Sequence, residues 1–279
     1  MVTGASSGIG AAVARELVRR GCVVFGTVRG AADAASLAAR GATPVLMDVT
    51  DAASIAAARV QVERALAGRP LAGLVNNAGI AGAGPLELLP LEEFRHVLEV
   101  NLIGVLAVTQ AFLPLLKAAR GRIVNVSSVA GRGALPFMGP YAASKFALEA
   151  MSDSLRRELL PFRVAVIVIE PGSVQSRIWE KVEAMDLSRY RDTPYASVLE
   201  RFRDAALRGA KRAPPADSVA RAVGKALTAR RPAIRMLVSA HPIIDRLVLR
   251  IPDRWMDWLI ERAVWGKAGK REGGKGKAG

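Results

Sequence analysis

The chain has 279 residues, 51% of them hydrophobic and 23% charged, and this composition excludes an intrinsically disordered protein. Its single cysteine, Cys22, cannot form an internal disulfide, and one cysteine with two histidines cannot build a cysteine-rich zinc site. The net charge of +15 is typical of nucleic-acid-binding proteins, but the positive residues are spread along the chain and only 5% of residues are aromatic. We therefore expect no specific nucleic-acid binding.

The start of the chain and its most apolar window bear on location. No secretory signal peptide opens the sequence, because motif residues begin at Val2, and we expect a cytoplasmic protein. The most apolar window, Val97 to Leu116, contains Glu99, Asn101 and Pro114, which a membrane span would have to place in lipid. We expect this window to form a buried or interface helix.

Over the first 175 residues, short β-branched runs alternate with longer alanine- and leucine-rich stretches of helical periodicity. This pattern predicts a parallel sheet covered by helices on both faces. The predicted strands are Cys22 to Val28, Pro44 to Met47, Leu74 to Asn76, Arg122 to Val126, Val164 to Ile169 and Ile234 to Val238. The predicted helices are Gly8 to Arg20, Asp51 to Ala67, Leu91 to Ala119, Pro140 to Leu160 and Asp217 to Ala229.

The pattern changes after Pro171. Val174 to Pro215 is polar, irregular and rich in arginine, which favours either a mobile loop or a pair of short helices. His241 to Trp265 holds three of the four tryptophans at roughly helical spacing. A basic, glycine-rich tail that we expect to be disordered begins at Gly266.

A glycine-rich loop lies between the first β-like residues and the first predicted helix. It reads Thr3-Gly4-Ala5-Ser6-Ser7-Gly8-Ile9-Gly10. Its glycines permit a tight turn and a close approach of the backbone, and N–H groups at a helix start bind pyrophosphate readily. The alternative is a glycine-rich turn that is capped by Ser6 or Ser7.

With this loop the sequence begins to resemble the short-chain dehydrogenase/reductase family, in which T-G-x-x-x-G-x-G holds a nicotinamide dinucleotide. Two more features of that family follow in order: Asp48-Val49 after the third strand, where the family's Asp contacts adenine, and Asn76-Asn77-Ala78-Gly79 after the fourth. The resemblance implies a single α/β domain of the doubly wound Rossmann type, with a seven-stranded sheet in the order 3-2-1-4-5-6-7. It also implies that Gly4, Ser6, Ser7, Gly8, Ile9 and Gly10 bind the cofactor.

The end of the second strand bears on which dinucleotide binds. Relatives that use NAD usually end this strand with an acidic residue that holds both ribose hydroxyls, whereas this chain reads Thr27-Val28-Arg29. An Asp there would repel a 2′-phosphate, but Arg29 can hold it with forked, charge-assisted hydrogen bonds. We therefore expect NADP(H) in preference to NAD(H). The alternative is that Arg29 is a solvated surface residue.

Tyr141 and Lys145 lie one turn apart on a predicted helix, so the phenol and the ammonium project from the same face. Carbonyl reduction needs a proton donor, and a phenol of pKa about 10 is a weak acid–base group near neutrality unless its pKa is tuned. A nearby positive charge lowers the pKa of a phenol, and we expect Lys145 to do so. In the family that the sequence resembles, this lysine also holds the nicotinamide ribose.

Two further polar residues complete the expected site. Ser128 follows the strand Arg122 to Val126, and its spacing to Tyr141 matches the family, in which the hydroxyl holds the substrate oxygen. Ser127 is the competing candidate, and it also fits a hydroxyl that satisfies strand-end backbone groups.

Asn101 is polar in an otherwise apolar helix. In the family, the corresponding asparagine distorts its helix and binds a water that links the lysine to solvent. The alternative for Asn101 is a helix-packing hydrogen bond. Neither His96 nor His241 falls at a motif position, and we expect both to be structural.

The segment Pro171-Gly172-Ser173-Val174-Gln175-Ser176 matches the family's P-G-x-V-x-T near the nicotinamide, with Ser176 in place of Thr. The run Gly121 to Ser176 looks most like the steroid- and retinol-handling branch, which acts on lipophilic alcohols and ketones. The resemblance thus implies an NADP(H)-dependent oxidoreductase that interconverts a lipophilic secondary alcohol and its ketone or aldehyde. The rival interpretation is a dinucleotide-binding regulator with little turnover.

The resemblance also implies a layout. Relatives assemble through helices that match Leu91 to Ala119 and Pro140 to Leu160, so we expect a homodimer or homotetramer. Residues 1–240 are expected to form the catalytic domain, 241–265 a helical extension and 266–279 the tail. The extension either covers the substrate pocket, packs at a subunit interface or lies on a membrane surface with its arginines at the headgroups.

The first strand is shorter than the family pattern, because only Met1 and Val2 precede Thr3. This strand lies in the centre of the sheet, so its loss would expose apolar neighbours and leave backbone groups unpaired. We therefore expect the true translation start to lie upstream of Met1.

Overall fold

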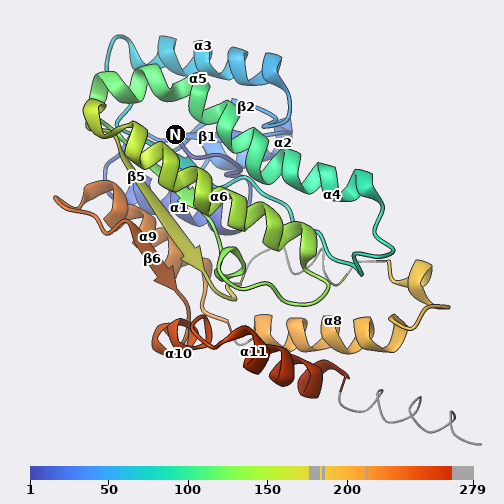
Figure 1. Cartoon of the computed structure of the whole chain (residues 1–279). Coiled ribbons are helices and arrows are strands. Elements are labelled where there is room, and N and C mark those ends of the chain that lie inside the picture. The colour runs from blue at the N-terminus through green and yellow to red at the C-terminus, as the bar shows by residue number, and fades with distance from the viewer. Residues whose placement is uncertain (176–182, 184–185, 212, 266–279) are drawn as a thin grey trace, which may run out of the picture.

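Parallel strands form the centre of the molecule, and helices cover both of their faces (Figure 1). The structure is a computed structural model, and it describes residues 1–175, 183, 186–211 and 213–265. The described strands are β1 (Phe25–Val28), β2 (Thr43–Leu46), β3 (Gly73–Asn76), β4 (Arg122–Val126), β5 (Ala165–Pro171) and β6 (Arg235–Val238). The α/β class is therefore confirmed, and each predicted strand is present with small differences at its ends.

The α-helices are α1 (Gly8–Arg19), α2 (Ala31–Ala38), α3 (Ala52–Leu66), α4 (Leu91–Leu98), α5 (Gly104–Ala119), α6 (Gly139–Glu158), α8 (Ala196–Lys211), α9 (Ala216–Thr228), α10 (Pro242–Val248) and α11 (Asp253–Ile260). Short 3₁₀ or π turns are η1 (Glu99–Ile103), η2 (Val129–Gly131), η3 (Leu160–Phe162), η4 (Ser188–Tyr190) and η5 (Glu261–Trp265). The predicted helices match α1, α3, α6 and α9 closely. The prediction lacked α2, which is only two turns long.

The sheet has the expected order, with one residue in the place of the first strand. β1 pairs with β2, and β3, β4, β5 and β6 pair in that order, all in parallel. Val2 forms parallel bridges to Gly26 of β1 and to Val75 of β3, and so it joins the two halves. If Val2 is counted as the first strand, the order is 3-2-1-4-5-6-7.

The short first strand is fully paired. The backbone N–H of Val2 donates to Phe25 O at 2.8 Å, and Val75 N–H donates to Met1 O at 2.9 Å. The Met1 ammonium donates to Gly73 O, and burial lowers the pKa of this amine to about 5. Met1 and Val2 are buried, so the expected exposure of apolar neighbours does not occur here. However, the strand predicted from Cys22 begins only at Phe25, and Cys22 is exposed.

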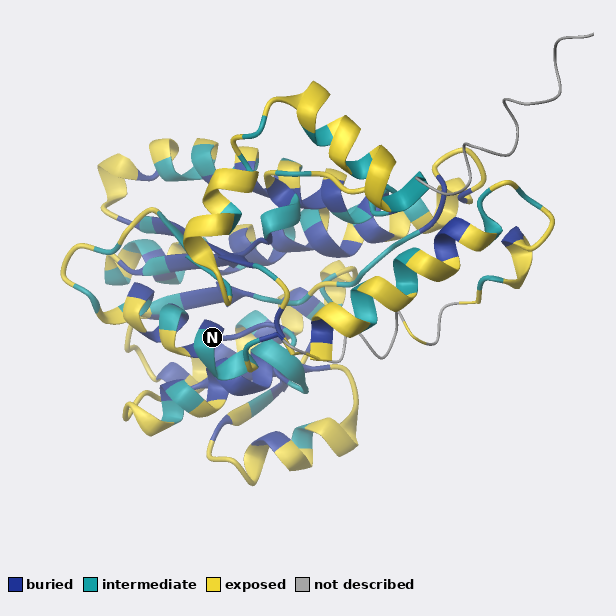
Figure 2. Cartoon of the chain, turned by 90° about the horizontal axis from the view of Figure 1, so that it is seen from below, coloured by how far each residue is buried: buried dark blue, intermediate teal, exposed yellow. Residues whose placement is uncertain are grey.

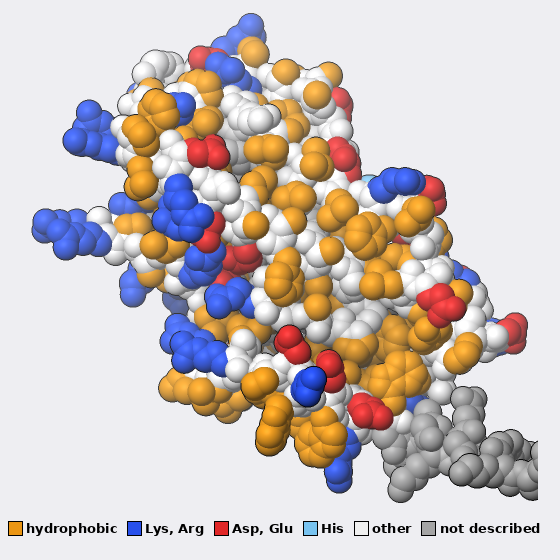
Figure 3. Space-filling model, viewed as in Figure 1, with side chains coloured by type: hydrophobic (Ala, Val, Ile, Leu, Met, Phe, Trp, Pro, Cys, Tyr) orange, Lys and Arg blue, Asp and Glu red, His pale blue; other side chains and the backbone are white. Residues whose placement is uncertain are grey.

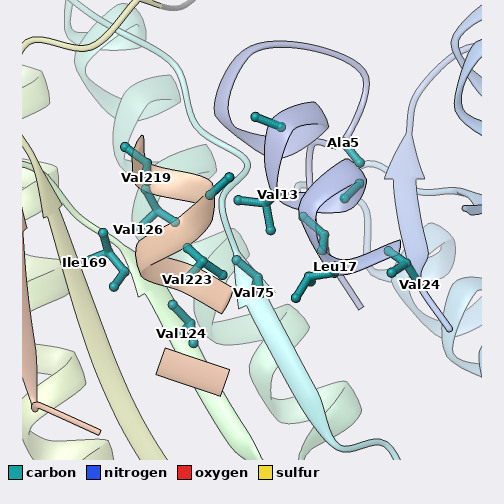
Figure 4. Close-up of a cluster of buried hydrophobic side chains, with 14 of the residues drawn as sticks. Ala5, Val13, Leu17, Val24, Val75, Val124, Val126, Ile169, Val219 and Val223 are labelled. Atoms are coloured by element: carbon teal, nitrogen blue, oxygen red, sulfur yellow. The ribbon is translucent and has the colours of Figure 1, made fainter. Parts of the chain in front are cut away.

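Alternate side chains of the central strands pack into two apolar layers, one on each face of the sheet. Leu74, Ile123 and Val166 pack with residues of α3 and α5. Val75, Val124 and Ile167 pack with α1 and α9 on the opposite face, and the close-up in Figure 4 shows this second layer. In Figure 2 the strands are accordingly buried between partly exposed helices. The carboxyl ends of the strands emerge together from between the two layers, and this edge is where a site can form.

The apolar window in the middle of the chain folds against the sheet, as expected, but it is not one regular helix. A π-helical turn, η1, separates α4 from α5. The whole stretch, Leu91–Ala119, is long and apolar enough to cross a membrane by length and composition. Its Val108, Phe112 and Leu116 are fully buried in the apolar layer beside α3. It therefore serves as a core helix in the described structure.

The C-terminal part packs beside a loop that precedes α6. Phe137, in that loop, contacts Phe202 of α8 and Trp265 of η5, with ring centroids 5.6 and 6.3 Å apart. Figure 1 shows α8 and α11 side by side at this end of the molecule. The interpretation of 174–215 as a loop or two short helices was wrong over residues 196–211, because an arginine-rich surface hides the apolar stripe of one long helix, α8.

Candidate active site

Two adjoining cavities lie at the carboxyl ends of the strands. The first, of about 280 Å³, is bordered by the glycine loop, the end of β1 and the loop after β3. The second, of about 250 Å³, is bordered by the ends of β4 and β5 and by the start of α6. Ile9, Asn77 and Gly79 line both cavities, so the two form one continuous site.

Most of the residues that were predicted to bind the cofactor line these cavities. The first is lined by Gly4, Ser6, Ser7, Gly8, Ile9, Arg29, Asp48, Val49, Asn77, Ala78 and Gly79. The second is lined by Ile9, Asn77, Gly79, Tyr141, Lys145, Pro171, Gly172 and Val174. Gly10, which was also predicted to bind the cofactor, lines neither cavity, and Ser176 lies outside the described residues.

The glycine loop presents free backbone donors at the N-terminus of α1. Gly4 and Gly8 adopt positive φ angles of 63° and 53°, a conformation that glycine tolerates without strain. Ser7 is the N-cap residue but makes no side-chain capping bond, so the alternative of a serine-capped turn is not what forms. The N–H groups of the first helical turn then have no partner within the helix and suit an anion. A Cβ on Gly10 would lie only 2.1 Å from Gly4 O, so the turn requires a glycine there.

Asn77 ties the glycine loop to the end of β3. Its Nδ2 donates to Thr3 O at 3.0 Å and to Gly4 O at 3.2 Å. In return the Thr3 hydroxyl accepts from the backbone N–H of Asn77 at 2.9 Å and of Ala78 at 3.0 Å. These bonds hold the two walls of the first cavity at a constant separation.

The prediction that Asn76 binds the cofactor is corrected here, because this residue lines neither cavity. Its side chain is buried, and Nδ2 donates to Thr109 Oγ1 at 3.0 Å and to Asn125 Oδ1 at 2.9 Å. Successive residues of a strand point to opposite faces, and Asn76 turns toward α5 and α6. Its role in the structure is to join β3, β4 and α5.

Arg29 stands exposed at the rim of the first cavity, directly after β1. Among the described residues it makes no hydrogen bond or ion pair, so its guanidinium is available to a ligand. Asp48 lines the same cavity, and hydrogen bonds from the backbone N–H and hydroxyl of Thr50 lower the pKa of its carboxyl. The sequence reasoning missed Asp33 and His96, which also line this cavity and carry no motif signal.

Ser128 and Tyr141 meet in the second cavity. Ser128 is the N-cap residue of η2, two residues after β4, and its hydroxyl also accepts from Ala130 N–H at 3.1 Å. Burial raises the pKa of the Tyr141 phenol, and a hydrogen bond with the Ser128 hydroxyl partly offsets that rise. Ser127 lines the cavity too, but its buried hydroxyl has no partner among the described residues. The role of satisfying backbone groups, which had suited Ser127, therefore belongs to Ser128.

Lys145 is buried beside Tyr141, with Nζ donating to Val126 O at 2.9 Å. Nζ lies 5.7 Å from the centroid of the Tyr141 ring. Burial lowers the pKa of Lys145 to about 8, and Glu149 acts in the opposite direction. Loss of hydration sets the net direction for the phenol in the protein alone, and the expectation that Lys145 lowers the pKa of Tyr141 stays a prediction.

Asn101 lies in the π-helical turn η1, as the expected helix distortion required, and is fully buried. Its Oδ1 accepts from Ile80 N–H at 2.8 Å, and its Nδ2 donates to Ile80 O at 2.9 Å and to Ser144 Oγ at 3.0 Å. Asn101 lines neither cavity. These contacts match the packing alternative, and the proton relay stays a prediction.

The second cavity has mainly apolar walls. Leu135 and Met138, from the loop before α6, line it together with Val126, Val129 and Val174. Val174 was predicted from the match to P-G-x-V-x-T. The other four were not among the predicted site residues, because any apolar residue that folds near the site resembles a core residue.

The residues present fit a nicotinamide dinucleotide. The free N–H groups at the start of α1 would hold its pyrophosphate, and the first cavity would take the adenosine end. Asn77 and Gly79 lie where the two cavities join, so the reactive ring would reach the second cavity beside Tyr141 and Lys145. The group would supply the hydride that no side chain can provide.

Comparison with known proteins agrees with this geometry. A family model described as short chain dehydrogenase matches residues 1–187. An NADPH-dependent 3-dehydrocapnine reductase from Ornithobacterium rhinotracheale is 35% identical over 269 residues, 93% of this chain and 95% of that protein. Retinol dehydrogenase 5 from Mus musculus is 39% identical over 281 residues, 94% of this chain and 88% of that protein.

A solved short chain dehydrogenase/reductase from Burkholderia phymatum, in complex with NAD, matches with a TM-score of 0.74 at 26% identity and covers 92% of this chain and 93% of its own. The resemblance to the retinol and steroid branch is confirmed by the retinol dehydrogenases and a 17-beta-hydroxysteroid dehydrogenase among the relatives. The chain belongs to the short chain dehydrogenase family and is an oxidoreductase that acts on CH–OH groups.

Proposed function

We propose that this oxidoreductase uses NADP(H) to interconvert a lipophilic secondary alcohol and its ketone or aldehyde. The observation that carries the proposal is the meeting of Tyr141, Ser128 and Lys145 on the wall of the second cavity, which continues into the first. A proton donor, an oxygen-binding hydroxyl and a positive charge are what carbonyl reduction needs around the reacting oxygen.

In this reaction Tyr141 gives its proton to the carbonyl oxygen in reduction and takes it back in oxidation. Because burial raises its pKa, the phenol is protonated at neutral pH and can act as the proton donor in reduction. The Ser128 hydroxyl holds the substrate oxygen, and the Lys145 ammonium favours the phenolate that proton transfer leaves. Asn101 would complete the relay that returns a proton to Lys145.

The preference for NADP(H) rests on Arg29. One relative is named NADPH-dependent and a solved member of the family holds NAD, so family membership does not choose between the two. The Arg29 guanidinium, which has no hydrogen bond or ion pair with the described residues, lies at the rim of the first cavity, where a 2′-phosphate would lie. A forked guanidinium–phosphate contact would therefore favour NADP(H).

The lipophilic substrate class rests on the walls of the second cavity. The polar end of this cavity, at Tyr141 and Ser128, is surrounded by the apolar side chains of Leu135, Met138, Val129 and Val174. A substrate with one reactive oxygen and a hydrophobic body would place the oxygen at the polar end and the body against the apolar walls. Retinol and dehydrocapnine occur in the names of relatives and are starting points for a screen.

The test is a screen of NADPH oxidation over hydrophobic ketones and aldehydes, run in parallel on the parent chain and on Tyr141→Phe. We expect turnover in the parent and a loss of at least about 100-fold in the variant. NADPH binding, followed by nucleotide fluorescence, should be equal in both. If both proteins bind NADPH and neither turns over any substrate, the result would favour the rival interpretation, a dinucleotide-binding regulator.

We also propose a homodimer or homotetramer built through α4, α5 and α6. Large apolar residues remain exposed here, namely Leu91 on α4, Ile103 on η1 between α4 and α5, and Phe146 on α6, which supports a covered surface there. Light scattering on the purified protein would give the mass. A monomer at micromolar concentration would contradict this assembly.

For location, we propose a cytoplasmic protein that contacts a membrane surface through α10 and α11. Large apolar residues on these helices are exposed, among them Ile243, Leu247, Trp255 and Trp258. Figure 3 has hydrophobic side chains gathered at its lower edge, where Figure 1 places the two helices. Flotation with anionic liposomes should bring up the parent chain and not a Trp255→Ser, Trp258→Ser double variant. Equal flotation of both would contradict the proposal.

A further inference from the structure

A cluster of charged residues lies one helical turn beyond Lys145, outside both cavities. At its centre Arg235, on β6, donates through Nε to Glu149 Oε2 at 2.9 Å. The same Nε lies 3.6 Å from Glu170 Oε1, and an Arg235 terminal nitrogen lies 3.0 Å from Asp153 Oδ1. Glu170 also accepts from Arg132 at 3.3 Å. The cluster thus links α6, β5 and β6 directly behind the predicted catalytic residues.

Glu149 is the member of this cluster closest in the chain to Lys145, four residues away on the same buried face of α6. Its Oε1 is buried and has no hydrogen-bond partner among the described residues. Gly131 closes the space beside it: a Cβ there would lie 3.0 Å from Lys145 O and 3.2 Å from Glu149 Cγ. One carboxylate oxygen is therefore kept from water without being neutralised by a direct contact.

Lys145 is a buried amine that needs an opposite charge. Its one hydrogen bond among the described residues goes to a neutral carbonyl, Val126 O. Within the described part of the chain no carboxylate lies at ion-pair distance from Nζ, and Tyr141 and Ser128 on the cavity side are uncharged. Burial therefore lowers the pKa of Lys145 to about 8, and the charge of Glu149 opposes this fall. Without that charge the pKa of Lys145 would be lower still, and more of the amine would be neutral.

We infer that Glu149, held by Arg235, is a positioning residue whose carboxylate supplies the counter-charge that keeps Lys145 protonated next to Tyr141. Arg235 is required in this arrangement because Glu149 and Glu170 lie close together: burial raises the pKa of Glu170, and the negative charge of Glu149 raises it further. A guanidinium that contacts both carboxylates lets them stay ionised side by side. The edge of the cluster is formed by Asp153 and Arg156, farther along α6, and by Arg132 on the neighbouring loop. Their side chains are more exposed than that of Glu149.

The inference rests on the proposed function only for the catalytic task of Lys145, and its first test is independent of turnover. The protein without nucleotide is labelled with ¹³Cε-lysine, and the nine lysine signals are titrated by NMR, with Lys145→Met to assign the signal. In Glu149→Gln, which retains the shape and an acceptor for Arg235, the Lys145 midpoint should move to lower pH by about 1 pH unit. An unchanged midpoint in the folded variant overturns the inference.

The matched control is Asp153→Asn. It also removes one negative charge from α6 and one contact of Arg235, but it lies about two turns from Lys145, one turn farther than Glu149. The Lys145 midpoint should stay at its parent value, and a shift equal to that of Glu149→Gln would overturn a specific role for Glu149. Glu149→Asp should give a midpoint between parent and Gln variant. If the Gln variant does not fold, a midpoint in the Asp variant at or above the parent value overturns the inference.

Kinetics provides the second readout. Turnover of Glu149→Gln should be close to the parent at pH 6 and fall to about one tenth of it at pH 8.5, because the neutral amine accumulates at lower pH. A merely structural role would lower turnover by the same factor at every pH. If no substrate is found, the NMR titration still decides the inference, so its failure and that of the proposed function are separable.

Discussion

Asn101 and Ile80 hold each other through a reciprocal pair of hydrogen bonds, in which Ile80 N–H donates to Oδ1 and Nδ2 donates to Ile80 O. The pair joins the π-helical turn η1 to the loop that follows β3. That loop carries Asn77 and Gly79, which line both cavities. The position of the site thus depends on one buried amide.

For Asn101→Ala we expect a loss of about 2–4 kcal/mol in the free energy of unfolding, because the backbone N–H and C=O of Ile80 lose their partner and Ser144 loses one of its hydrogen bonds. Urea denaturation followed by circular dichroism measures this loss. Gln110→Ala removes an exposed amide from α5 and should change the stability by less than about 0.5 kcal/mol. If Asn101→Ala is as stable as the parent and yet inactive, the residue acts as a relay and not as a packing group.

Reversing the charge at Arg29 should change the cofactor preference. In Arg29→Glu the KM for NADPH should rise about 10- to 100-fold, because a forked contact to the 2′-phosphate is replaced by repulsion, while the KM for NADH changes little. The matched control is Arg40→Glu, an exposed arginine outside the cavity. If both substitutions raise the KM for NADPH by the same factor, the effect comes from the net charge of the protein and not from a contact of Arg29.

Gly10 tests the fit of the glycine loop. In Gly10→Ala the new methyl would lie 2.1 Å from Gly4 O and 2.5 Å from Asn77 Nδ2, so the loop must open. We expect a loss of at least about 2 kcal/mol in stability and no detectable nucleotide binding, by thermal unfolding with and without NADPH. Gly209→Ala, in α8 with open space around it, should instead stabilise the protein by about 0.5 kcal/mol.

The buried amine of Lys145 should make stability depend on pH in a specific window. Its pKa is about 8 in the folded protein and 10.5 when exposed, so the unfolded chain binds more protons between these values. Stability therefore rises with pH across this window, and the cost of burying the charge is fully present below pH 8. Lys145→Met should be about 3 kcal/mol more stable than the parent at pH 7, and the difference should vanish near pH 10.5.

That prediction is measured as the difference between two denaturation curves at each pH, which cancels the titration of groups common to both chains. A difference that is constant from pH 7 to pH 10.5 would show that Lys145 is not buried as a charge. The opposite sign, with the parent more stable at pH 7, would show that other contacts outweigh the cost of burial.

The strands, four of the helices and most of the cofactor-lining residues could be predicted because each is signalled locally. Leu74 to Asn76, for example, is an apolar run followed by Asn77 and Gly79, and the strand end lies there in the structure. Asn76 could not be assigned in the same way, because a shift of one residue along a strand turns the side chain to the other face. The helix α8 was missed because its buried stripe is sparse among arginines.

The sequence by itself determined the family, the glycine loop and the helical spacing of Tyr141 and Lys145, since these are patterns within a few residues. Only the tertiary structure decided the proton affinities, because they depend on which groups are removed from water and which charges come near. Arg235 meets Glu149 from 86 positions away, and no local pattern records that contact. Burial of the phenol likewise raises the pKa that the neighbouring ammonium was expected to lower.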